Sequence, residues 1–306
     1  MDFSELDVAV LLPCYNEAVS IGDTIAAFRA ALPSAKIYVF DNNSTDGTAD
    51  AALAAGAIVR AETQQGKGAV VRRMFRDIKA DFYVIADGDN TYDAKCAPEM
   101  LILAQQGPFD LVNCIRRETK QDAYRGGHRF GNMLLTGAVR LIFGNRVQDM
   151  LSGYKVLSRR FVKSFPILAT GFDIETELTV HALELALPIA HTEADYQPRA
   201  EGSVSKLNTY RDGWRILRLI LRLLRHEQPL LFFGSCGIIT FIIAFIVACP
   251  LLITYLHTGL VPRLPTAILS IGIAIVGALS FTTGIILDTV SRGRKEARLL
   301  AYLSLC

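Results

Sequence analysis

The sequence predicts an α/β protein with a mostly parallel sheet, followed by two helices that cross a membrane. Three observations support this. Strand-like apolar runs alternate with helical patterns in the first two thirds of the chain, polar clusters directly follow three of the runs, and two stretches near the end carry no charge. Such alternation is typical of a sheet covered by helices. A chain of 306 residues also exceeds the usual size of one domain, as expected for one large domain with an appendage.

The predicted strands and helices follow one another in a regular order. Strands are expected at Val8–Leu12, Ile37–Phe40, Ala57–Arg60, Phe82–Ala86 and Leu111–Cys114. Helices are expected at Ile21–Leu32, Asp46–Ala55, Gly68–Ile78 and Ala97–Gln106. Ligands of such sheets gather at the carboxyl ends of the strands, so the polar residues that follow the strands are the candidate site.

Two apolar stretches near the end of the chain predict membrane spans. No Asp, Glu, Lys or Arg occurs from Pro229 to Pro262 or from Leu264 to Leu287. Each stretch is long enough to cross a hydrocarbon core as a helix, which takes roughly 20 residues. The spans are expected at about 230–256 and 265–288. Two buried core helices are the alternative, but core helices rarely lack charge over such lengths.

A basic stripe precedes the first span. Five arginines recur at spacings of three and four, which places them on one side of a helix: Arg211, Arg215, Arg218, Arg222 and Arg225. This pattern predicts an amphipathic juxtamembrane helix at 208–228 that lies among anionic headgroups. A helix packed on the soluble domain, with a solvated arginine face, is the alternative.

Basic residues on either side of the spans predict the topology. Four follow the second span, namely Arg292, Arg294, Lys295 and Arg298, whereas the loop between the spans has only Arg263. The positive-inside rule therefore places both termini and the soluble domain in the cytosol, at the cytoplasmic membrane. The short acidic N-terminus does not resemble a signal peptide. The expected organisation is a soluble domain (1–207), the juxtamembrane helix (208–228), a two-helix anchor (229–290) and a basic cytosolic tail (291–306).

Several classes of protein are disfavoured by the sequence. The six cysteines have no paired spacing, so neither a disulfide framework nor a zinc site is expected. No Gly-x-Gly-x-x-Gly follows the first strand, and Gln65–Gly68 lacks the first Gly and the Ser/Thr of a P-loop, which disfavours a dehydrogenase or an ordinary NTPase. The net charge of +2 is uninformative, and no nucleic-acid partner is expected.

Asp87-Gly88-Asp89, directly after the fourth predicted strand, is the most informative motif. Two carboxylates at this spacing suit one Mg²⁺ or Mn²⁺ ion whose other ligands are substrate phosphates. An exposed turn is the alternative for a motif this short. Its order after two other polar motifs, Pro13–Glu17 and Asp41–Thr48, makes the set specific.

In their order and spacing, these three motifs resemble the cytosolic domain of family 2 glycosyltransferases, which have the GT-A fold. More narrowly, the chain resembles the polyprenyl-phosphate glycosyltransferases, the group similar to dolichol-phosphate mannose and glucose synthases. The resemblance covers roughly residues 7–225, and the two spans match membrane-anchored bacterial members.

The resemblance implies a nucleotide-sugar site. The residues that would bind the nucleotide sugar are Pro13, Tyr15, Asn16, Glu17, Asp41, Asn43, Lys67 and Asp87, with Lys67 balancing phosphate charge. Asp87 and Asp89 would flank the diphosphate and hold the metal, with Asp89 the direct ligand. The alternatives are a helix cap for Glu17, turn or cap roles for Asp41 and Asp46, and a solvated surface position for Lys67.

Two departures from the group's pattern affect this assignment. Thr91 stands where such families often have a Gln two residues after the second Asp, which removes one expected side-chain ligand. Asn42-Asn43 stands within the usual Asp-Asp-Gly-Ser pattern, which leaves some ribose contacts open.

The same resemblance implies an acceptor site around Asp149–Lys155, which is similar to the group's Asp-x-x-Ser-Gly-aromatic-Lys/Arg segment. The candidate ligands of the lipid phosphate are Arg117, Arg129, Ser152 and Lys155. Arginine suits bidentate phosphate binding. A solvated helix face is the alternative for Arg125 and Arg129.

The expected activity is inverting, metal-dependent transfer of a sugar from a nucleotide sugar to a polyprenyl phosphate such as undecaprenyl phosphate. The product would be a lipid-linked monosaccharide for cell-envelope glycosylation. A phosphate monoester is already a dianion at cytosolic pH, because its second pKa is near 6, so no catalytic base is assigned.

Two other functions stay open. A processive polysaccharide synthase would carry a Gln-x-x-Arg-Trp motif, which this sequence lacks. A non-catalytic, nucleotide-binding membrane scaffold would not need the Asp-x-Asp motif. A UDP-linked donor is preferred over a GDP-linked one by resemblance only. The sugar and the lipid chain length also stay open, and a homo-oligomer is possible.

Overall fold

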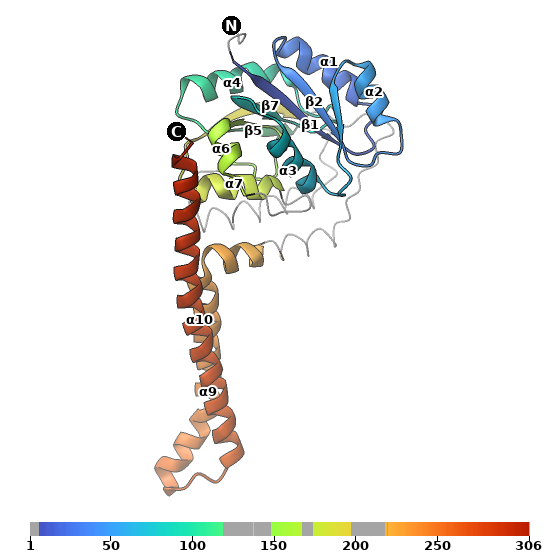
Figure 1. Ribbon diagram of the computed structural model, residues 1–306. Coiled ribbons are helices and arrows are strands. Elements are labelled where there is room, and N and C mark those ends of the chain that lie inside the picture. Colours follow the sequence, from blue (N-terminus) through green and yellow to red (C-terminus); the bar gives the residue numbers. More distant parts are fainter. Residues whose placement is uncertain are drawn as a thin grey trace. The chain divides into compact units, whose positions relative to one another are not determined.

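The computed structural model describes residues 6–118, 148–166, 174–196 and 220–305, together with positions 137 and 218. The chain divides into two compact units. The first comprises Met1–Ile216 with Arg298–Cys306, and the second comprises Leu217–Ala297. Each unit is described by itself (Figure 1).

The first unit is built on a seven-stranded sheet of order β3-β2-β1-β4-β6-β5-β7 (Figure 1). Strands β1, β2, β3 and β4 pair in parallel, and β5 pairs in parallel with β7. Strand β6 runs antiparallel to both of its neighbours, β4 and β5. The prediction of a mostly parallel sheet is therefore confirmed, with β6 as the reversed strand.

The predicted elements of the N-terminal half are confirmed, with small differences at their ends. The strands are β1 (Val8–Cys14), β2 (Lys36–Asp41), β3 (Ile58–Ala61), β4 (Phe82–Ile85) and β5 (Leu111–Glu118). The helices are α1 (Ile21–Ala31), α2 (Thr48–Ala54), α3 (Lys67–Asp77) and α4 (Ala97–Gln106), with a short 3₁₀ turn, η1 (Ala94–Cys96), before α4. Strand β5 continues four residues beyond its predicted end because β7 pairs with it as far as Glu118.

Two apolar layers cover the two faces of this sheet. Side chains of the central strands alternate between the layers, as the period-two geometry of a strand requires. One layer contains Val10 and Val84 with residues of α1 and α4, and the other contains Leu11 and Ile85 with residues of α3 and α7. Both layers are well buried, so the sheet is a rigid base for the loops at its carboxyl edge.

Four further elements of this unit were not predicted. They are β6 (Lys155–Ser158), α6 (Arg159–Ser164), α7 (Ile174–Glu184) and β7 (Ile189–Tyr196). Strands β6 and β7 lack an alternating pattern with turn signals at both ends, and they form by pairing with β5, which lies far away in the sequence. Short elements of this kind depend on tertiary contacts more than on local propensity.

The last residues of the chain pack within the first unit. The Tyr302 side chain is buried in the apolar layer that also contains α3 and α7. Its hydroxyl donates to a carboxylate oxygen of the fully buried Asp110 (2.7 Å), which also accepts from Ser158 Oγ and Arg160 Nε. Arg298 pairs with Glu184 of α7. The C-terminal residues are thus part of the core of this unit.

The second unit contains α9 (Pro229–Thr258) and, as far as Ala297, α10 (Leu264–Leu303), and both helices are long and apolar enough to cross a membrane. They include the two predicted spans. They approach closely where Gly237 faces the carbonyl oxygen of Gly277, and Ser280 Oγ donates to the Phe233 carbonyl (2.9 Å).

The ends of this unit differ in part from the predicted elements. Helix α10 continues beyond the second span through the predicted basic tail, helped by an i, i+4 ion pair between Asp288 and Arg292. Residues 221–227 of the predicted juxtamembrane helix are helical, and most of its remainder lies outside the described residues.

Candidate active site

The ends of the central strands bring the predicted polar motifs to one edge of the sheet. Cys14 at the end of β1 lies opposite Asp41 at the end of β2. Because β6 is antiparallel, its first residue, Lys155, lies at the same edge, opposite Ile85 of β4 and Asn113 of β5. Motifs that are more than 100 residues apart in the sequence therefore meet there.

The loops after β1 and β2 are joined by hydrogen bonds. The Asn16 amide oxygen accepts from Thr45 N (2.8 Å), and the Asn16 backbone N–H donates to Ser44 Oγ (2.9 Å). Asp46 accepts from Ala18 N (3.0 Å) and from the hydroxyl and backbone N–H of Thr48, so it acts as a loop-fixing residue near the start of α2. These contacts hold the two loops as one wall of the site.

The other residues predicted for the nucleoside lie on or beside this wall. Pro13 is half-buried at the end of β1, and Tyr15 is exposed. The Glu17 carboxylate accepts from Ser20 Oγ (3.3 Å), and the Glu17 carbonyl accepts from the Ile21 backbone N–H at the start of α1. Glu17 therefore contacts the start of α1 through its carbonyl and the Ser20 hydroxyl, but α1 has no side-chain hydrogen bond at its N-cap, Ser20.

Asp41 carries an unsatisfied buried oxygen. Its side chain is 9% exposed, and Oδ2 accepts from the backbone N–H of Ser44 (3.2 Å). Oδ1 is buried without a hydrogen-bond partner. An unpaired buried carboxylate oxygen costs free energy unless a donor reaches it, so Asp41 is suited to accept a hydrogen bond from a ligand.

Lys67 joins two carboxylates from different elements. It is the first residue of α3, and its Nζ lies 2.5 Å from Asp87 Oδ1 and also pairs with Glu175 on α7. Burial alone would lower the pKa of Lys67, but the charges of Asp87 and Glu175 outweigh it and raise the pKa well above its ordinary value. The ammonium group is therefore permanently charged beside the Asp-x-Asp motif.

Asp89 is held by its own turn. It is 3% exposed, and its Oδ1 accepts from the hydroxyl of Thr91 (2.6 Å) and from the backbone N–H of Thr91 (3.3 Å). Thr91 thus orients the Asp89 carboxylate. Asp87, in contrast, pairs with Lys67.

The Asp149–Lys155 segment lies against the same motif. The Gly153 backbone N–H donates to Tyr92 Oη (2.8 Å), and a Cβ at Gly153 would lie 2.6 Å from Asp87 Oδ2. Asp149 accepts two hydrogen bonds from the Arg116 guanidinium (2.7 and 2.8 Å) and one from the Arg116 backbone N–H (3.2 Å). Burial alone would raise the pKa of Asp149, but the bonds from Arg116 lower it below its ordinary value.

The residues predicted for the lipid phosphate differ in their exposure to solvent. Lys155 is 1% exposed and donates to Asn113 Oδ1 (2.5 Å), and Ser152 is fully buried and accepts from Tyr154 N (3.3 Å). Arg117 is exposed and pairs with Glu193 of β7 (2.5 Å). Arg129 lies outside the described residues. Among the described arginines of this region, Arg116 is the one that contacts the Asp149–Lys155 segment.

The electrostatics of Cys14 show that the motifs converge. Burial raises the pKa of the Cys14 thiol well above its ordinary value, and four nearby carboxylates raise it further. They come from three separate motifs: Glu17, Asp41, Asp87 and Asp89. A site with this many carboxylates repels a diphosphate unless cations are present, and Lys67 is a cation built into it.

Glu175 is the main site residue that sequence reasoning missed. It lies in Asp173-Ile174-Glu175-Thr176-Glu177, where nothing distinguishes one acid from the next. Its importance comes from its buried pairing with Lys67, which is 108 positions away in the sequence (175 − 67). No local signal predicts a contact of this kind.

We expect a Gly153→Ala substitution to lower turnover by about tenfold or more, because the added methyl group displaces the Asp87 carboxylate from Lys67. The substitution tests the position of the Asp87 carboxylate, because it changes no charge. Steady-state kinetics and a thermal melt of the purified protein check it. Gly22→Ala is the matched control, because a Cβ at Gly22 meets no atom within 4 Å. Unchanged turnover in Gly153→Ala would contradict the proposed close fit.

Lys155 predicts a pH dependence of stability. Burial lowers the pKa of Lys155 from 10.5 to about 8. Between these two pH values the unfolded chain binds a proton that the folded chain does not, so the free energy of unfolding rises with pH over this window. We expect the melting temperature of the wild type to rise relative to Lys155→Met between pH 8 and pH 10. A pH-independent difference between the two proteins would show that Lys155 is charged when folded.

Comparisons with known proteins give the family. The model of Glycosyl transferase family 2 matches residues 9–165. Glycosyltransferase AglJ of Haloferax volcanii is 34% identical over 231 residues, which are 75% of this chain and 76% of the relative. An uncharacterized protein of Shigella flexneri is 48% identical over 155 residues, which are 51% of this chain and 95% of the relative.

A more distant relative and a solved structure extend these findings. The dolichyl-phosphate hexose transferase of Haloferax volcanii is 24% identical over 222 residues, 72% of this chain and 96% of the relative. The glucosyl-3-phosphoglycerate synthase of Mycobacterium tuberculosis, solved with Mn²⁺, UDP and glucosyl-3-phosphoglycerate, shares the fold. Its TM-score is 0.60 at 22% identity, over 72% of this chain and 80% of that one.

The fold is therefore that of the GT-A enzymes. The chain belongs to glycosyl transferase family 2 and is a glycosyltransferase, as its three ordered motifs predicted.

Proposed function

We propose that this enzyme transfers one sugar from a UDP-sugar to a polyprenyl phosphate such as undecaprenyl phosphate, with inversion at the anomeric carbon. The product is a lipid-linked monosaccharide for cell-envelope glycosylation. The observation that carries the proposal is the cluster of Asp87, Asp89, Lys67 and Glu175 at the carboxyl edge of the sheet, in a chain with two helices long enough to cross a membrane.

The chain's organisation follows the same proposal. We assign residues 1–207 to the cytosolic catalytic domain, 208–228 to the juxtamembrane helix, 229–290 to the anchor and 291–306 to the cytosolic tail. A lipid acceptor stays in the bilayer, so an enzyme that is anchored at the cytoplasmic membrane meets it at a high local concentration.

The donor side is supported by Asp41. Its unpaired buried Oδ1 is suited to accept a hydrogen bond from an N–H or O–H group of a nucleoside. The wall that includes Pro13, Tyr15, Asn16 and Glu17 lies beside it. The structural neighbour from Mycobacterium tuberculosis was also solved with Mn²⁺ and UDP-glucose, which favours uracil as the base in this proposal.

The donor groups fit a divalent metal that is shared with a substrate. Among the described residues, no group of three or more His, Cys, Asp or Glu side chains could hold a metal alone. Asp87 and Asp89 supply the one or two carboxylates with which Mg²⁺ or Mn²⁺ is usually bound when substrate phosphates complete its coordination. A bound metal would supply charge stabilisation for the diphosphate. Asp89, oriented by Thr91, would hold it.

The acceptor side is supported by Arg116. Asp149 holds its guanidinium in a fixed orientation beside the Asp149–Lys155 segment, and arginine suits phosphate oxygens. Arg117, Arg129, Ser152 and Lys155 remain predictions for this phosphate. The name of the dolichyl-phosphate hexose transferase of Haloferax volcanii supports a lipid-phosphate acceptor.

The chemistry needs positioning more than proton transfer. A phosphate oxygen of the acceptor attacks the anomeric carbon of the sugar, and the bond from that carbon to the UDP oxygen breaks. The acceptor is already ionised, so no residue has to remove a proton. Lys67, at the positive N-terminal end of α3, stabilises the charge that develops on the departing UDP. UDP leaves with both electrons of the broken bond, and the sugar remains on the lipid phosphate.

A panel of nucleotide sugars tests this proposal. Purified protein is incubated with undecaprenyl phosphate and with each UDP- and GDP-sugar in turn. The masses of the lipid products are then measured by mass spectrometry. One donor is expected to give a product, and undecaprenol without phosphate is expected to give none. Sugar polymers, or transfer to undecaprenol, would contradict the proposal.

A further inference from the structure

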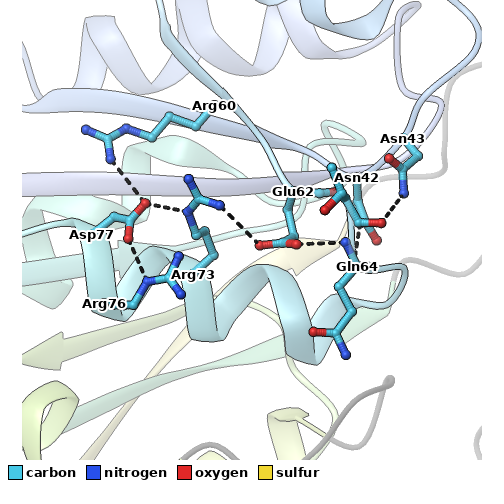
Figure 2. A network of polar contacts seen from close by, with 9 residues as sticks. Asn42, Asn43, Arg60, Glu62, Gln64, Arg73, Arg76 and Asp77 are labelled. Atoms are coloured by element: carbon cyan, nitrogen blue, oxygen red, sulfur yellow. Dashed lines mark hydrogen bonds and ion pairs between the residues drawn. The ribbon is translucent and has the colours of Figure 1, made fainter.

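The segment Glu62–Gly66, here called the 62–66 loop, connects β3 to α3 and ends at Lys67. The side chain of Asn42 is the centre of its hydrogen bonds (Figure 2). The Asn42 amide nitrogen donates to the carbonyl oxygens of Glu62 (2.9 Å) and Gln64 (2.8 Å). Its amide oxygen accepts from the backbone N–H of Gly66 (2.7 Å).

This arrangement requires an amide. Asn42 is 3% exposed, and its side chain must donate two hydrogen bonds and accept one in the same place. A carboxylate has nearly the same shape, but it cannot donate and would face two carbonyl oxygens. The hydrogen bonds of Asn42 to the 62–66 loop therefore explain why an amide, and not the Asp of the Asp-Asp-Gly-Ser pattern, stands at this position.

The 62–66 loop is also fixed from two other directions. The amide nitrogen of Asn43 donates to the Thr63 carbonyl (2.9 Å) and to Gln65 Oε1 (3.1 Å). Glu62 Oε1 accepts from the Gln64 backbone N–H (2.7 Å), and its other oxygen lies 3.8 Å from an Arg73 guanidinium nitrogen on α3.

On the α3 side of this network, the Asp77 carboxylate forms ion pairs with three arginines. Asp77 accepts from Arg73 (2.5 Å), Arg76 (2.9 Å) and Arg60 (3.3 Å), as Figure 2 shows. Burial alone would raise the pKa of Asp77, but the guanidinium groups of Arg73 and Arg76 lower it to about 2. The carboxylate stays ionised at any physiological pH, so Arg73 keeps its orientation toward Glu62.

The 62–66 loop positions Lys67 at the carboxyl edge of the sheet. Gly66 has φ of 124° and ψ of 140°, a backbone conformation that is essentially restricted to glycine. This turn directs the chain into α3, whose first side chain, Lys67, reaches both Asp87 and Glu175. The bond from Gly66 N–H to Asn42 fixes the residue immediately before Lys67.

We propose that Asn42 is a positioning residue for nucleotide binding. It sets the place of the Lys67 ammonium through the 62–66 loop and makes no contact with the nucleoside. The inference rests on the proposed function only in taking a nucleoside diphosphate as the ligand beside Lys67; it does not depend on the acceptor. Asn42 is coupled to Lys67 although the two side chains belong to different elements.

A double-mutant cycle tests this coupling. The affinity of the full-length protein for UDP is measured by calorimetry in the presence of Mg²⁺ for the wild type, Asn42→Asp, Lys67→Met and the double variant. Asn42→Asp is expected to weaken UDP binding by about tenfold in the wild type and by less than about twofold in Lys67→Met. A general loss of structure would weaken both backgrounds equally.

Controls separate position from charge and from folding. Gln105→Glu makes the same amide-to-carboxylate change at an exposed position of α4, and it is expected to leave UDP affinity unchanged. Asn42→Ala, which adds no charge, takes the place of Asn42→Asp in the cycle if that variant does not fold.

The proposal is overturned if the effects of Asn42 and Lys67 substitutions add, or if the Asn42 variants bind UDP as the wild type does. Because UDP binding needs no acceptor, these outcomes are distinct from a failure to glycosylate polyprenyl phosphate. Loss of product with an intact cycle would refute the proposed acceptor and leave the role of Asn42 standing.

Discussion

Replacing Asp89 by alanine is expected to lower the rate of lipid-product formation by a factor of about 10³ or more. Asp89 is the buried carboxylate whose orientation Thr91 fixes, whereas Asp87 is already paired with Lys67. Asp89 would hold the metal that stabilises the negative charge of the leaving diphosphate. Without Asp89 this stabilisation is lost. The rate is measured with undecaprenyl phosphate and the preferred donor over a range of Mn²⁺ and Mg²⁺ concentrations.

Two further measurements make the Asp89 result specific. UDP affinity of Asp89→Ala is expected to become insensitive to Mn²⁺, whereas that of the wild type rises with it. Asp50→Ala, on the exposed side of α2, is the matched control and is expected to behave as the wild type. If Asp89→Ala retains activity within about threefold, with the same dependence on metal, the assignment of Asp89 as a metal ligand is wrong.

Replacing Lys67 by methionine is expected to have the second largest effect, a loss of about 10²-fold to 10³-fold in turnover. The substitution removes the built-in cation from a site whose carboxylates, together with burial, raise the pKa of the Cys14 thiol. It also leaves Asp87 and Glu175 as neighbouring carboxylates without their shared ammonium group, so UDP meets stronger repulsion. Turnover, UDP affinity and the melting temperature together check this expectation.

Lys163→Met is the matched control for Lys67→Met. Lys163 donates to the carbonyl oxygens of Phe75 (2.5 Å) and Ile78 (3.1 Å) near the end of α3, away from the Asp-x-Asp motif in the sequence and in its contacts. We expect this variant to lower the melting temperature and to keep the turnover of the folded protein. Equal losses of turnover in the two variants would mean that Lys67 acts only through stability.

Much of the fold follows from local patterns in the sequence. Strands such as β1 and β4 are fully apolar runs that end in polar residues, and α1 to α4 have helical periodicity between them. Their order fixes the parallel sheet, and a parallel sheet fixes the edge at which the motifs after β1, β2 and β4 meet. For this reason Asp41, Asp87 and Asp89 could be placed together before the structure was known.

The rest of the site depends on contacts between distant segments. Glu175 is one of several acids in its segment until α7 packs near α3 and brings it to Lys67. Asn42 was not among the predicted site residues, because its role depends on hydrogen bonds to the 62–66 loop, which lies about 20 residues further along the chain. Lys155 is predicted as a phosphate ligand, but the reversed strand β6 places it in a buried position, where it donates to Asn113.

The central claim is that the phosphate of a polyprenyl lipid receives one sugar directly from UDP. The most direct test is to measure the mass and the anomeric configuration of the lipid product together with the UDP released by the purified protein. We expect one UDP for each lipid product, a mass increase of one sugar residue, and an anomeric configuration opposite to that of the donor. UDP release without a lipid product, or retention of the donor's configuration, would contradict it.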